Sequence, residues 1–254
     1  MLLAVDVGNT QTNIGAFDGD DLVADWRFAT EAEATYDELA LILSSLLAVK
    51  DLTLAGTDGS VLATVVPALG PAYVEMFDRH TGGKCVEVGS GVVTDMPILV
   101  ERPAELGPDR IANALAAYDR VKGPCAAVDF GTSTNFDVVS AQGEFLGGAI
   151  GPGLEVSIEA LSRRAARLPR IELAKPATAI GRNTGTAMQS GFVNGFAGLV
   201  DGIARRIDLE LGGGATFIAT GGLAPVIAPH CETIDEIDQL LTLTGLRLVW
   251  ESNR

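Results

Sequence analysis

The spacing of hydrophobic positions predicts that the chain opens with an antiparallel meander. Residues 2–7 form an apolar run, a turn follows at Gly8 and Asn9, and further apolar runs occupy residues 14–17 and 22–28. Short runs of this kind, separated by turns that contain glycine, asparagine or aspartate, are typical of neighbouring strands.

Apolar residues at helical spacing predict helices after this meander. Thr35 and Glu38 have the form of a capping box, and the leucines that follow them lie three or four residues apart. The helices predicted in this way span residues 35–50, 71–81, 109–121 and 184–207. Buried strands are predicted at residues 61–66, 125–129 and 216–219.

The last of these helices carries a stripe of glycines. Gly191, Gly195, Gly198 and Gly202 are spaced by three or four residues, which places them on one face of a helix. Each glycine costs a helix roughly 1 kcal/mol relative to alanine, so the stripe calls for a compensating interaction. We expect another backbone to pack closely against it, from elsewhere in the chain or from a second subunit.

One short pattern occurs twice. Val5 to Asn13 reads VDVGNTQTN and Val128 to Phe136 reads VDFGTSTNF, each an apolar strand that ends in Asp-x-Gly before a turn rich in hydroxyls and amides. Gly123 and Pro124 interrupt the chain just before the second copy. We therefore expect two halves, residues 1–122 and residues 123–254, each opening with the same hairpin.

Composition narrows the choice of partners. Of 254 residues 47% are hydrophobic, and the formal net charge is −15. A surface this acidic repels nucleic acid and anionic membranes, so we expect neither as a partner. The chain begins without a basic leader, and no window reaches about 18 uninterrupted apolar residues, so a cytoplasmic protein is expected.

Cysteine and histidine usage argues against a metal framework. The three cysteines are Cys85, Cys125 and Cys231, with no closely spaced pair, and there are only two histidines. This set fits neither a disulfide framework nor a zinc site, and it indicates ordinary thiols in a reducing compartment.

The repeated hairpin has the chemistry of a phosphate site. A glycine in the turn allows phosphate to approach the backbone amides, Asn and Thr add donors, and Asp6 can hold a hydrated Mg²⁺ beside the phosphates. An ordinary β-turn also favours Asp, Gly and Asn, so a purely structural turn is the alternative. The second copy at Asp129 favours the phosphate interpretation.

Two further segments carry candidate chemistry. The strand at residues 216–219 runs into Gly221 and Gly222, whose bare backbone suits a flat ligand such as adenine, although a plain strand-to-helix loop has the same pattern. Asp109 opens a predicted helix, where its carboxylate can be an N-cap and can also accept a substrate proton. Arg110 beside it suits either an anionic substrate or a plain surface position.

In this order, these elements resemble the sugar kinase and actin-like ATPase superfamily, and within it the type III pantothenate kinases. The motifs that carry the resemblance are DVGNT from Asp6, GPDR from Gly107, DFGT from Asp129, GGAIGPG from Gly147, NTGTAMQSG from Asn183 and TGGLAP from Thr220. The resemblance implies an α/β fold of two duplicated actin-like (ribonuclease H-like) domains with the active site in the cleft between them. It also implies phosphorylation of pantothenate by ATP, the first step of coenzyme A biosynthesis.

The resemblance also implies roles for individual residues. Asp109 is the implied general base, and Asp129 is the implied ligand of a monovalent cation, K⁺ or NH₄⁺. The residues implied to contact ATP are Asp6, Val7, Gly8, Asn9, Thr10, Gln11, Thr12, Asn13 and Thr132. The residues implied to hold pantothenate are Val100, Gly107, Pro108, Asp109, Arg110 and Thr184. Thr184 is implied to reach the site of a neighbouring subunit, so a homodimer is expected, with a divalent cation such as Mg²⁺ accompanying ATP.

The sequence departs from this family pattern at several positions. Val100 stands where an aromatic residue is common, Ser133 and Asn135 replace alanine and threonine, and Gly151 replaces alanine. Two alternatives therefore remain: a kinase or phosphatase for another small alcohol on the same fold, and a non-catalytic regulator of the Bvg accessory factor type.

Overall fold

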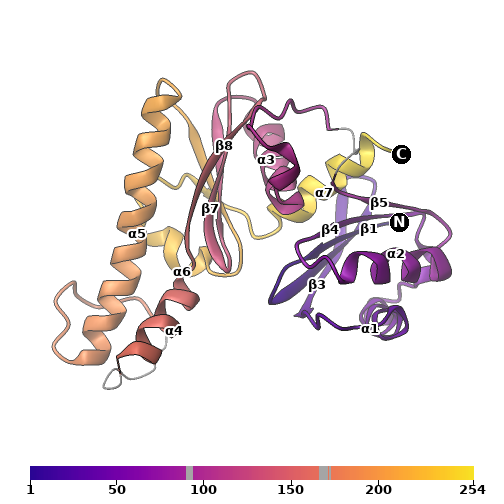
Figure 1. Ribbon diagram of the computed structural model, residues 1–254, viewed down its shortest axis with the longest axis horizontal. Helices are drawn as coiled ribbons and strands as arrows, with labels where there is room; N and C mark the ends of the chain where they lie inside the picture. Colours follow the sequence, from indigo (N-terminus) through magenta and orange to yellow (C-terminus); the bar gives the residue numbers. More distant parts are fainter. Residues whose placement is uncertain (90–93, 166–170, 172) are drawn as a thin grey trace. The chain divides into compact units, whose positions relative to one another are not determined.

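Two five-stranded sheets organise the chain. The computed structural model describes residues 1–89, 94–165, 171 and 173–254 (Figure 1). By its internal contacts the chain divides into two units. The first comprises Met1–Pro97, Glu101–Ala116 and Leu241–Arg254, and the second comprises Ile98–Val100 and Ala117–Leu240.

The first sheet follows the predicted meander. Its strands are β1 (Leu2–Val7), β2 (Gln11–Asp18), β3 (Asp21–Ala29), β4 (Gly59–Thr64) and β5 (Lys84–Glu87). They lie in the order β3-β2-β1-β4-β5. β1 pairs antiparallel with β2 and parallel with β4, so the carboxyl end of β1 lies beside the start of β2 and the carboxyl end of β4. The Asp-x-Gly motif stands at that end.

Helices cover both faces of the first sheet. α1 (Tyr36–Ala48) and α2 (Leu69–His80) lie next to each other beside the first sheet (Figure 1). Their leucine, tyrosine and phenylalanine side chains are buried in one core with Val5, Ile14 and other residues of one sheet face. α1 begins with the predicted capping box of Thr35 and Glu38. α7 (Leu241–Glu251) packs on the opposite face, where its Trp250 ring lies directly over Gly59.

The second sheet repeats the topology of the first. Its strands are β6 (Cys125–Phe130), β7 (Ser133–Val139), β8 (Phe145–Pro152), β9 (Thr216–Thr220) and β10 (Glu236–Ile237), in the order β10-β9-β6-β7-β8. β6 pairs antiparallel with β7 and parallel with β9, as β1 does with β2 and β4. The predicted duplication is therefore present in the strand order of both sheets.

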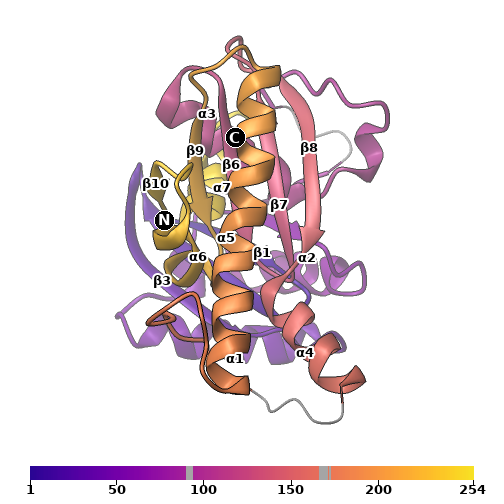
Figure 2. The same cartoon turned by 90° about the vertical axis from the view of Figure 1, so that its left-hand side faces the viewer.

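Three helices accompany the second sheet. α5 (Thr184–Glu210) lies along one face of the sheet (Figure 2), with α4 (Leu154–Arg164) and the short α6 (Ala224–Ile227) next to it. Phe136, Phe196 and Phe217 belong to the core between helices and sheet. Thr186 and Asn183 form a reciprocal cap at the start of α5.

The remaining helix, α3 (Pro108–Val121), starts one position before the predicted one. Its first part packs on α7, where a β-carbon on Gly245 would lie 1.9 Å from the Ala112 carbonyl oxygen. Because α7 packs on the first sheet, the contact-based units do not follow a single cut of the chain near Gly123, and α7 belongs to the first unit. The continuous halves 1–122 and 123–254 stay a prediction.

The glycine stripe of α5 has no close partner in the described part of the chain. A β-carbon added at Gly191, Gly195 or Gly198 would meet nothing within 4 Å, and all three residues are exposed. Of the two expected partners, a backbone from elsewhere in the described chain is therefore excluded. No helix among the described segments has the length and apolar character needed to cross a membrane.

Candidate functional site

The first hairpin joins β1 to β2 through Gly8, Asn9 and Thr10. The turn is closed by the Gly8 amide, which donates to the Gln11 carbonyl at 3.0 Å. Asn9, Thr10 and Gln11 are exposed, whereas Val7 is fully buried. The exposed amides of the turn are therefore the groups that a phosphate can reach.

Asp6 and Asn13 form a pair at the base of this hairpin. They are partners in the β1–β2 register, and Asn13 Nδ2 donates to Asp6 Oδ2 at 3.2 Å. Both side chains are half-buried. The amide fixes the orientation of the carboxylate at the carboxyl end of β1.

A hydroxyl pair lies beneath the same hairpin. Thr12 is only 1% exposed, and its Oγ1 lies 2.9 Å from Oγ1 of Thr30, the residue after β3. The Thr30 amide also donates to the Thr10 carbonyl at 3.0 Å. The Thr12 hydroxyl therefore has a hydrogen-bond partner within the protein, the Thr30 hydroxyl. Its role as an ATP contact stays a prediction.

The second hairpin has the same construction. The Gly131 amide donates to the Ser133 carbonyl at 3.0 Å, and Asp129 is the register partner of Asn135, as Asp6 is of Asn13. Ser133 Oγ donates to Asn135 Oδ1 at 2.9 Å, which orients that amide. Thr132 is exposed at the tip of the turn.

The loop after β9 packs against Asp129. Gly221 has a φ of 88°, and a β-carbon there would lie 2.3 Å from Asp129 Oδ1 and 2.8 Å from the Phe130 amide nitrogen. The Leu223 amide donates to the Phe130 carbonyl at 3.2 Å. This position therefore requires glycine, both because φ is positive and because a side chain would collide with the Asp129 carboxylate. The segment is the predicted strand-to-helix loop, and it connects β9 to α6.

A third glycine completes this arrangement. A β-carbon on Gly153 would lie 2.2 Å from the Thr132 carbonyl oxygen and 2.7 Å from that of Gly131. The end of the GGAIGPG segment therefore packs directly on the second hairpin. Within the second unit, the structure brings together three of the motifs singled out in the sequence: the hairpin, Gly153 and Gly221.

The Asp129 carboxylate stands in a glycine-lined part of the second unit. One carboxylate lies between Gly221 and Gly131, close to a turn that carries backbone carbonyls. The described residues contain no cluster of three or more His, Cys, Asp and Glu side chains able to hold a metal ion. The predicted monovalent cation at Asp129 stays a prediction.

Asp109 lies in a tight loop at the start of α3. The Gly107 carbonyl accepts from the Arg110 and Ile111 amides, so Gly107 is the cap position and Asp109 is the second helical residue. The N-cap interpretation of Asp109 is therefore wrong. Its Oδ1 accepts from the Arg110 amide at 2.9 Å, and a β-carbon on Gly107 would lie 2.4 Å from that oxygen.

The environment of Asp109 favours its neutral form. Burial raises the pKa of the carboxyl above its ordinary value, and hydrogen bonding to the Arg110 amide together with the Arg110 charge opposes this rise only in part. Perturbed pKa values cluster at functional sites, so the direction of this shift agrees with the base role predicted for Asp109, which stays a prediction.

Val100 and Thr184 complete the predicted set, and both lie in the second unit. Val100 is half-buried beside Gly147, where a β-carbon would lie 3.7 Å from Val100 Cγ1 and φ is 116°. Thr184 is exposed as the first residue of α5.

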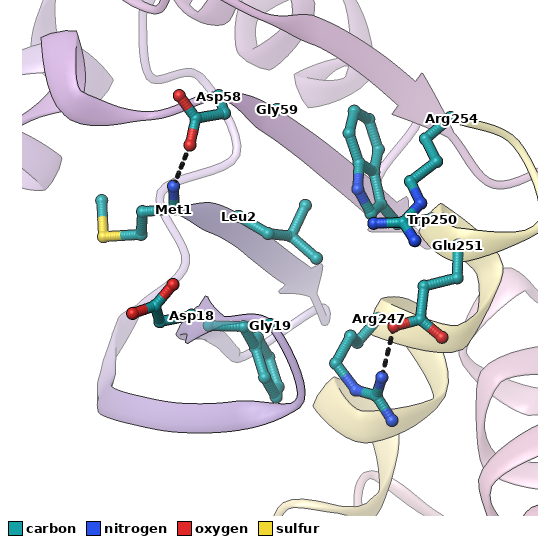
Figure 3. A pocket seen from close by; sticks show the side chains of 11 residues that line it. Met1, Leu2, Asp18, Gly19, Asp58, Gly59, Arg247, Trp250, Glu251 and Arg254 are labelled. Carbon is teal, nitrogen blue, oxygen red and sulfur yellow. Dashed lines mark hydrogen bonds and ion pairs between the residues drawn. The ribbon is translucent and has the colours of Figure 1, made fainter.

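A pocket elsewhere in the first unit is not part of this set. It lies at the amino end of β1, where Met1 bonds to Asp58, and α7 contributes Arg247, Trp250 and Glu251 (Figure 3). None of the predicted site residues lines it. Its volume of about 190 Å³ is also below that of a typical drug-sized ligand site.

The sequence analysis missed two contributors to the hairpins. Thr30 carries no local motif, because its contact with Thr10 and Thr12 depends on the β2–β3 register. Asn135 was noted only as a departure from the family. Its position opposite Asp129 follows from the register, and the matching Asn13 in the first copy was the available signal.

Comparison with known proteins identifies the family. Residues 2–206 match the family model described as type III pantothenate kinase. A type III pantothenate kinase of Moorella thermoacetica is 48% identical over 253 residues, covering 100% of both chains. The enzyme of the same name from Acidothermus cellulolyticus is 49% identical over 253 residues, covering 100% of this chain and 99% of the relative.

Solved structures show the same fold at low identity. A Campylobacter jejuni protein described as a Baf family transcriptional activator is 17% identical, with a TM-score of 0.61 and coverage of 99% of this chain and 98% of that one. A ROK hexokinase from Thermus thermophilus is 15% identical, with a TM-score of 0.54 and coverage of 98% and 97%. These two structures support the expected actin-like, sugar kinase fold. The relatives of 48–49% identity over the full length of the chain identify the family within that fold. The chain belongs to the type III pantothenate kinase family.

Proposed function

We propose that this protein transfers the γ-phosphoryl group of ATP to the primary hydroxyl of pantothenate, giving 4'-phosphopantothenate for coenzyme A biosynthesis. The observation that carries the proposal is full-length family similarity, and the half-buried Asp109 with its raised pKa in the GPDR motif agrees with it. Phosphoryl transfer depends mostly on positioning and charge neutralisation, and the described motifs are suited to both.

Asp109 is the proposed general base. A carboxylate of raised pKa accepts the hydroxyl proton more readily than an ordinary one, because proton transfer is most efficient when the pKa of the base approaches the working pH. Gly107 leaves room for the carboxylate, and Arg110 next to it is the proposed partner of the pantothenate carboxylate. Pro108, Val100 and Thr184 are proposed to contribute to the same substrate site.

The two hairpins are the proposed nucleotide-binding elements. In the first, the Gly8 amide is engaged within the turn, so the amides of Asn9, Thr10 and Gln11 are the proposed phosphate donors. Asp6, oriented by Asn13, is the proposed partner of a hydrated Mg²⁺. ATP and a divalent cation follow from membership in a kinase family.

Asp129 is the proposed ligand of a monovalent cation, and Thr132 is the proposed ATP contact of the second hairpin. The carboxylate lies against Gly221, and its Oδ1 would be 3.5 Å from a β-carbon on Gly131. A cation held there offsets negative charge as the phosphoryl group transfers.

A homodimer in the cytoplasm is the proposed state of the protein. The glycine face of α5 is exposed and open at Gly191, Gly195 and Gly198, as a second subunit's helix would require. Thr184 stands at the start of the same helix. The free cysteines agree with a reducing compartment.

The proposal is tested by measuring ADP formation with and without pantothenate in the presence of Mg²⁺ and K⁺. We expect turnover that requires pantothenate and yields a phosphorylated product detectable by mass spectrometry. ATP turnover with another small alcohol, but not with pantothenate, would assign the protein to a different substrate. Val100 makes this control worthwhile, because it replaces an aromatic residue common in the family. No turnover with any alcohol would favour a regulatory role.

A further inference from the structure

We propose that Thr30 is a positioning residue that holds the first phosphate hairpin in its nucleotide-binding shape. Neither the sequence motifs nor the family comparison points to it. The inference rests on the proposed function only in taking ATP as the ligand of this hairpin.

Thr30 extends the sheet to the turn. It directly follows β3, whose last residue, Ala29, pairs with Gln11 at the start of β2. The Thr30 amide donates to the Thr10 carbonyl at 3.0 Å. The turn is therefore tied to the neighbouring strand on its outer side, in addition to its own closing bond.

The Thr30 hydroxyl makes a second connection. Its Oγ1 lies 2.9 Å from Oγ1 of Thr12, a residue that is 1% exposed. Burying a hydroxyl without a partner costs free energy, so this bond fixes the Thr12 rotamer and with it the first residues of β2. Thr30 thus contacts the hairpin at Thr10 and at Thr12, on either side of Gln11.

On its other side, Thr12 lies near Tyr73 of α2, which is completely buried. Burial raises the pKa of its phenol to about 12, and the Thr12 hydroxyl opposes this rise in part. Thr12 therefore lies between Thr30 and the core, so we infer that it affects ATP through the shape of the turn rather than by touching the nucleotide.

The amides proposed to bind phosphate belong to the segment that Thr30 holds. Asn9, Thr10 and Gln11 lie between Gly8 and Thr12, and a phosphate site of backbone amides requires them to point to one place. Release of the Thr10 or Thr12 contact lets the turn sample other conformations, and ordering it again on binding costs affinity for ATP.

The test compares Thr30→Val, which keeps the shape and the backbone amide but removes the hydroxyl, with Thr30→Ser, which keeps the hydroxyl. Affinities for ATP with Mg²⁺ and for pantothenate are measured separately by calorimetry. For Thr30→Val we expect about five- to tenfold weaker ATP binding, the net worth of one hydrogen bond, and pantothenate binding within about twofold of the parent. Thr30→Ser should restore ATP binding to within about twofold of the parent. Hydrogen exchange at the amides of residues 8–12 should be faster in Thr30→Val than in the parent or in Thr30→Ser.

Thr12→Val and the double variant test whether both residues act through one bond. The double variant should bind ATP no more weakly than the weaker single variant, because the same bond is lost. Thr57→Val is the matched control. Thr57 is also 1% exposed, its hydroxyl has no partner among the described residues, and it lies outside the hairpin. Its ATP affinity should equal that of the parent.

Three results would overturn the proposal: parental ATP affinity in Thr30→Val, equal loss of ATP and pantothenate binding, or additive losses in the double variant. If Thr30→Val fails to fold, Thr12→Val decides, since it breaks the same bond from the other side. If the parent binds ATP without phosphorylating pantothenate, the proposed function fails while the positioning role is still decided by ATP affinity. If the parent does not bind ATP, hydrogen exchange of the hairpin decides the role of Thr30.

Discussion

At the scale of single residues, the three carboxylates proposed for the site have different surroundings. Asp6 accepts a hydrogen bond from Asn13, which orients it. Asp129 lies against Gly221, whose missing side chain leaves it space. Asp109 has the raised pKa, because burial outweighs the neighbouring amide and charge. The raised pKa of Asp109 agrees with its proposed role as the proton acceptor.

The first prediction concerns Asp109→Asn. The amide has nearly the shape of the carboxylate but cannot accept the hydroxyl proton, so kcat should fall by at least about 10²-fold. ATP affinity should stay near that of the parent. Because Asp109 is the second helical residue and not the N-cap, no cap is lost and the melting temperature should not fall. A variant with more than about a tenth of parental kcat would contradict the base assignment.

A second prediction follows from the direction of the pKa shift. The base must be ionised, so the acid limb of kcat/KM should lie above the ordinary aspartate value of 3.8. The same shift lowers the free energy of unfolding of the parent as pH rises. Between the unfolded and the raised folded pKa the native state binds more protons, so the carboxylate destabilises the fold as pH rises through this window. The melting temperature of Asp109→Asn relative to the parent should therefore rise with pH over the same window. A difference that does not change with pH would argue against the shift.

At the scale of elements, local patterns predicted the strands and helices that have a strong period. The helix expected at residues 35–50 is observed at Tyr36–Ala48, with its capping box formed. The strand β8 was not predicted, because Gly147, Gly148 and Gly151 interrupt the alternation that marks a strand. The two-residue β10 is too short to have a period.

Local patterns predicted the hairpin motifs of the candidate site but not the contacts between distant residues that support them. The Asp-x-Gly motifs are local and were predicted, whereas the Thr12–Thr30 pair joins residues 18 positions apart. The Gly221 approach to Asp129 joins two strands distant in sequence. Such contacts depend on register and on a parallel neighbour, which a single sequence does not specify.

The third prediction belongs to the β6–β7 hairpin. Asp129→Asn keeps the volume of the side chain beside Gly221 but removes its charge. If Asp129 holds the monovalent cation, replacing Na⁺ by K⁺ should stimulate the parent but not the variant. Asp25→Asn is a suitable control, since Asp25 is exposed on β3 and should leave the K⁺ response unchanged. An unchanged K⁺ response in Asp129→Asn would place the cation elsewhere.

At the scale of the whole molecule, a repeat of only nine residues predicted a duplicated architecture. The two sheets share their strand order, with an antiparallel meander followed by parallel strands. The second hairpin has one residue fewer between its partners, since Asp6 pairs with Asn13 and Asp129 with Asn135. A direct alignment of the two copies therefore hid Asn135 as the counterpart of Asn13. The membership of α7 in the first unit was also hidden, because it depends on packing between the two ends of the chain.

The last prediction concerns assembly through the glycine face of α5. Leucine is the better helix former, by up to about 1 kcal/mol. A β-carbon at Gly195 also meets nothing within 4 Å among the residues that the structure describes, so Gly195→Leu should not destabilise an isolated subunit. Between two helices packed at this face, the larger side chain would separate the backbones. We therefore expect the variant to sediment as a monomer at concentrations where the parent is a dimer, with unchanged or higher thermal stability of the subunit fold.

Activity provides the second readout of this prediction. If Thr184 completes the site of the neighbouring subunit, the monomeric variant should lose pantothenate affinity along with the dimer. Ser44→Leu is a matched control, because it adds the same side chain at an exposed position of another helix, α1, and should change neither property. A parent that sediments as a monomer and is fully active, or a Gly195→Leu variant that remains dimeric, would show that the glycine stripe serves another purpose. Cyclic dimers are the commonest assembly of soluble proteins, and a helix face with no close partner in the described part of the chain is a specific place where the proposed dimer would form.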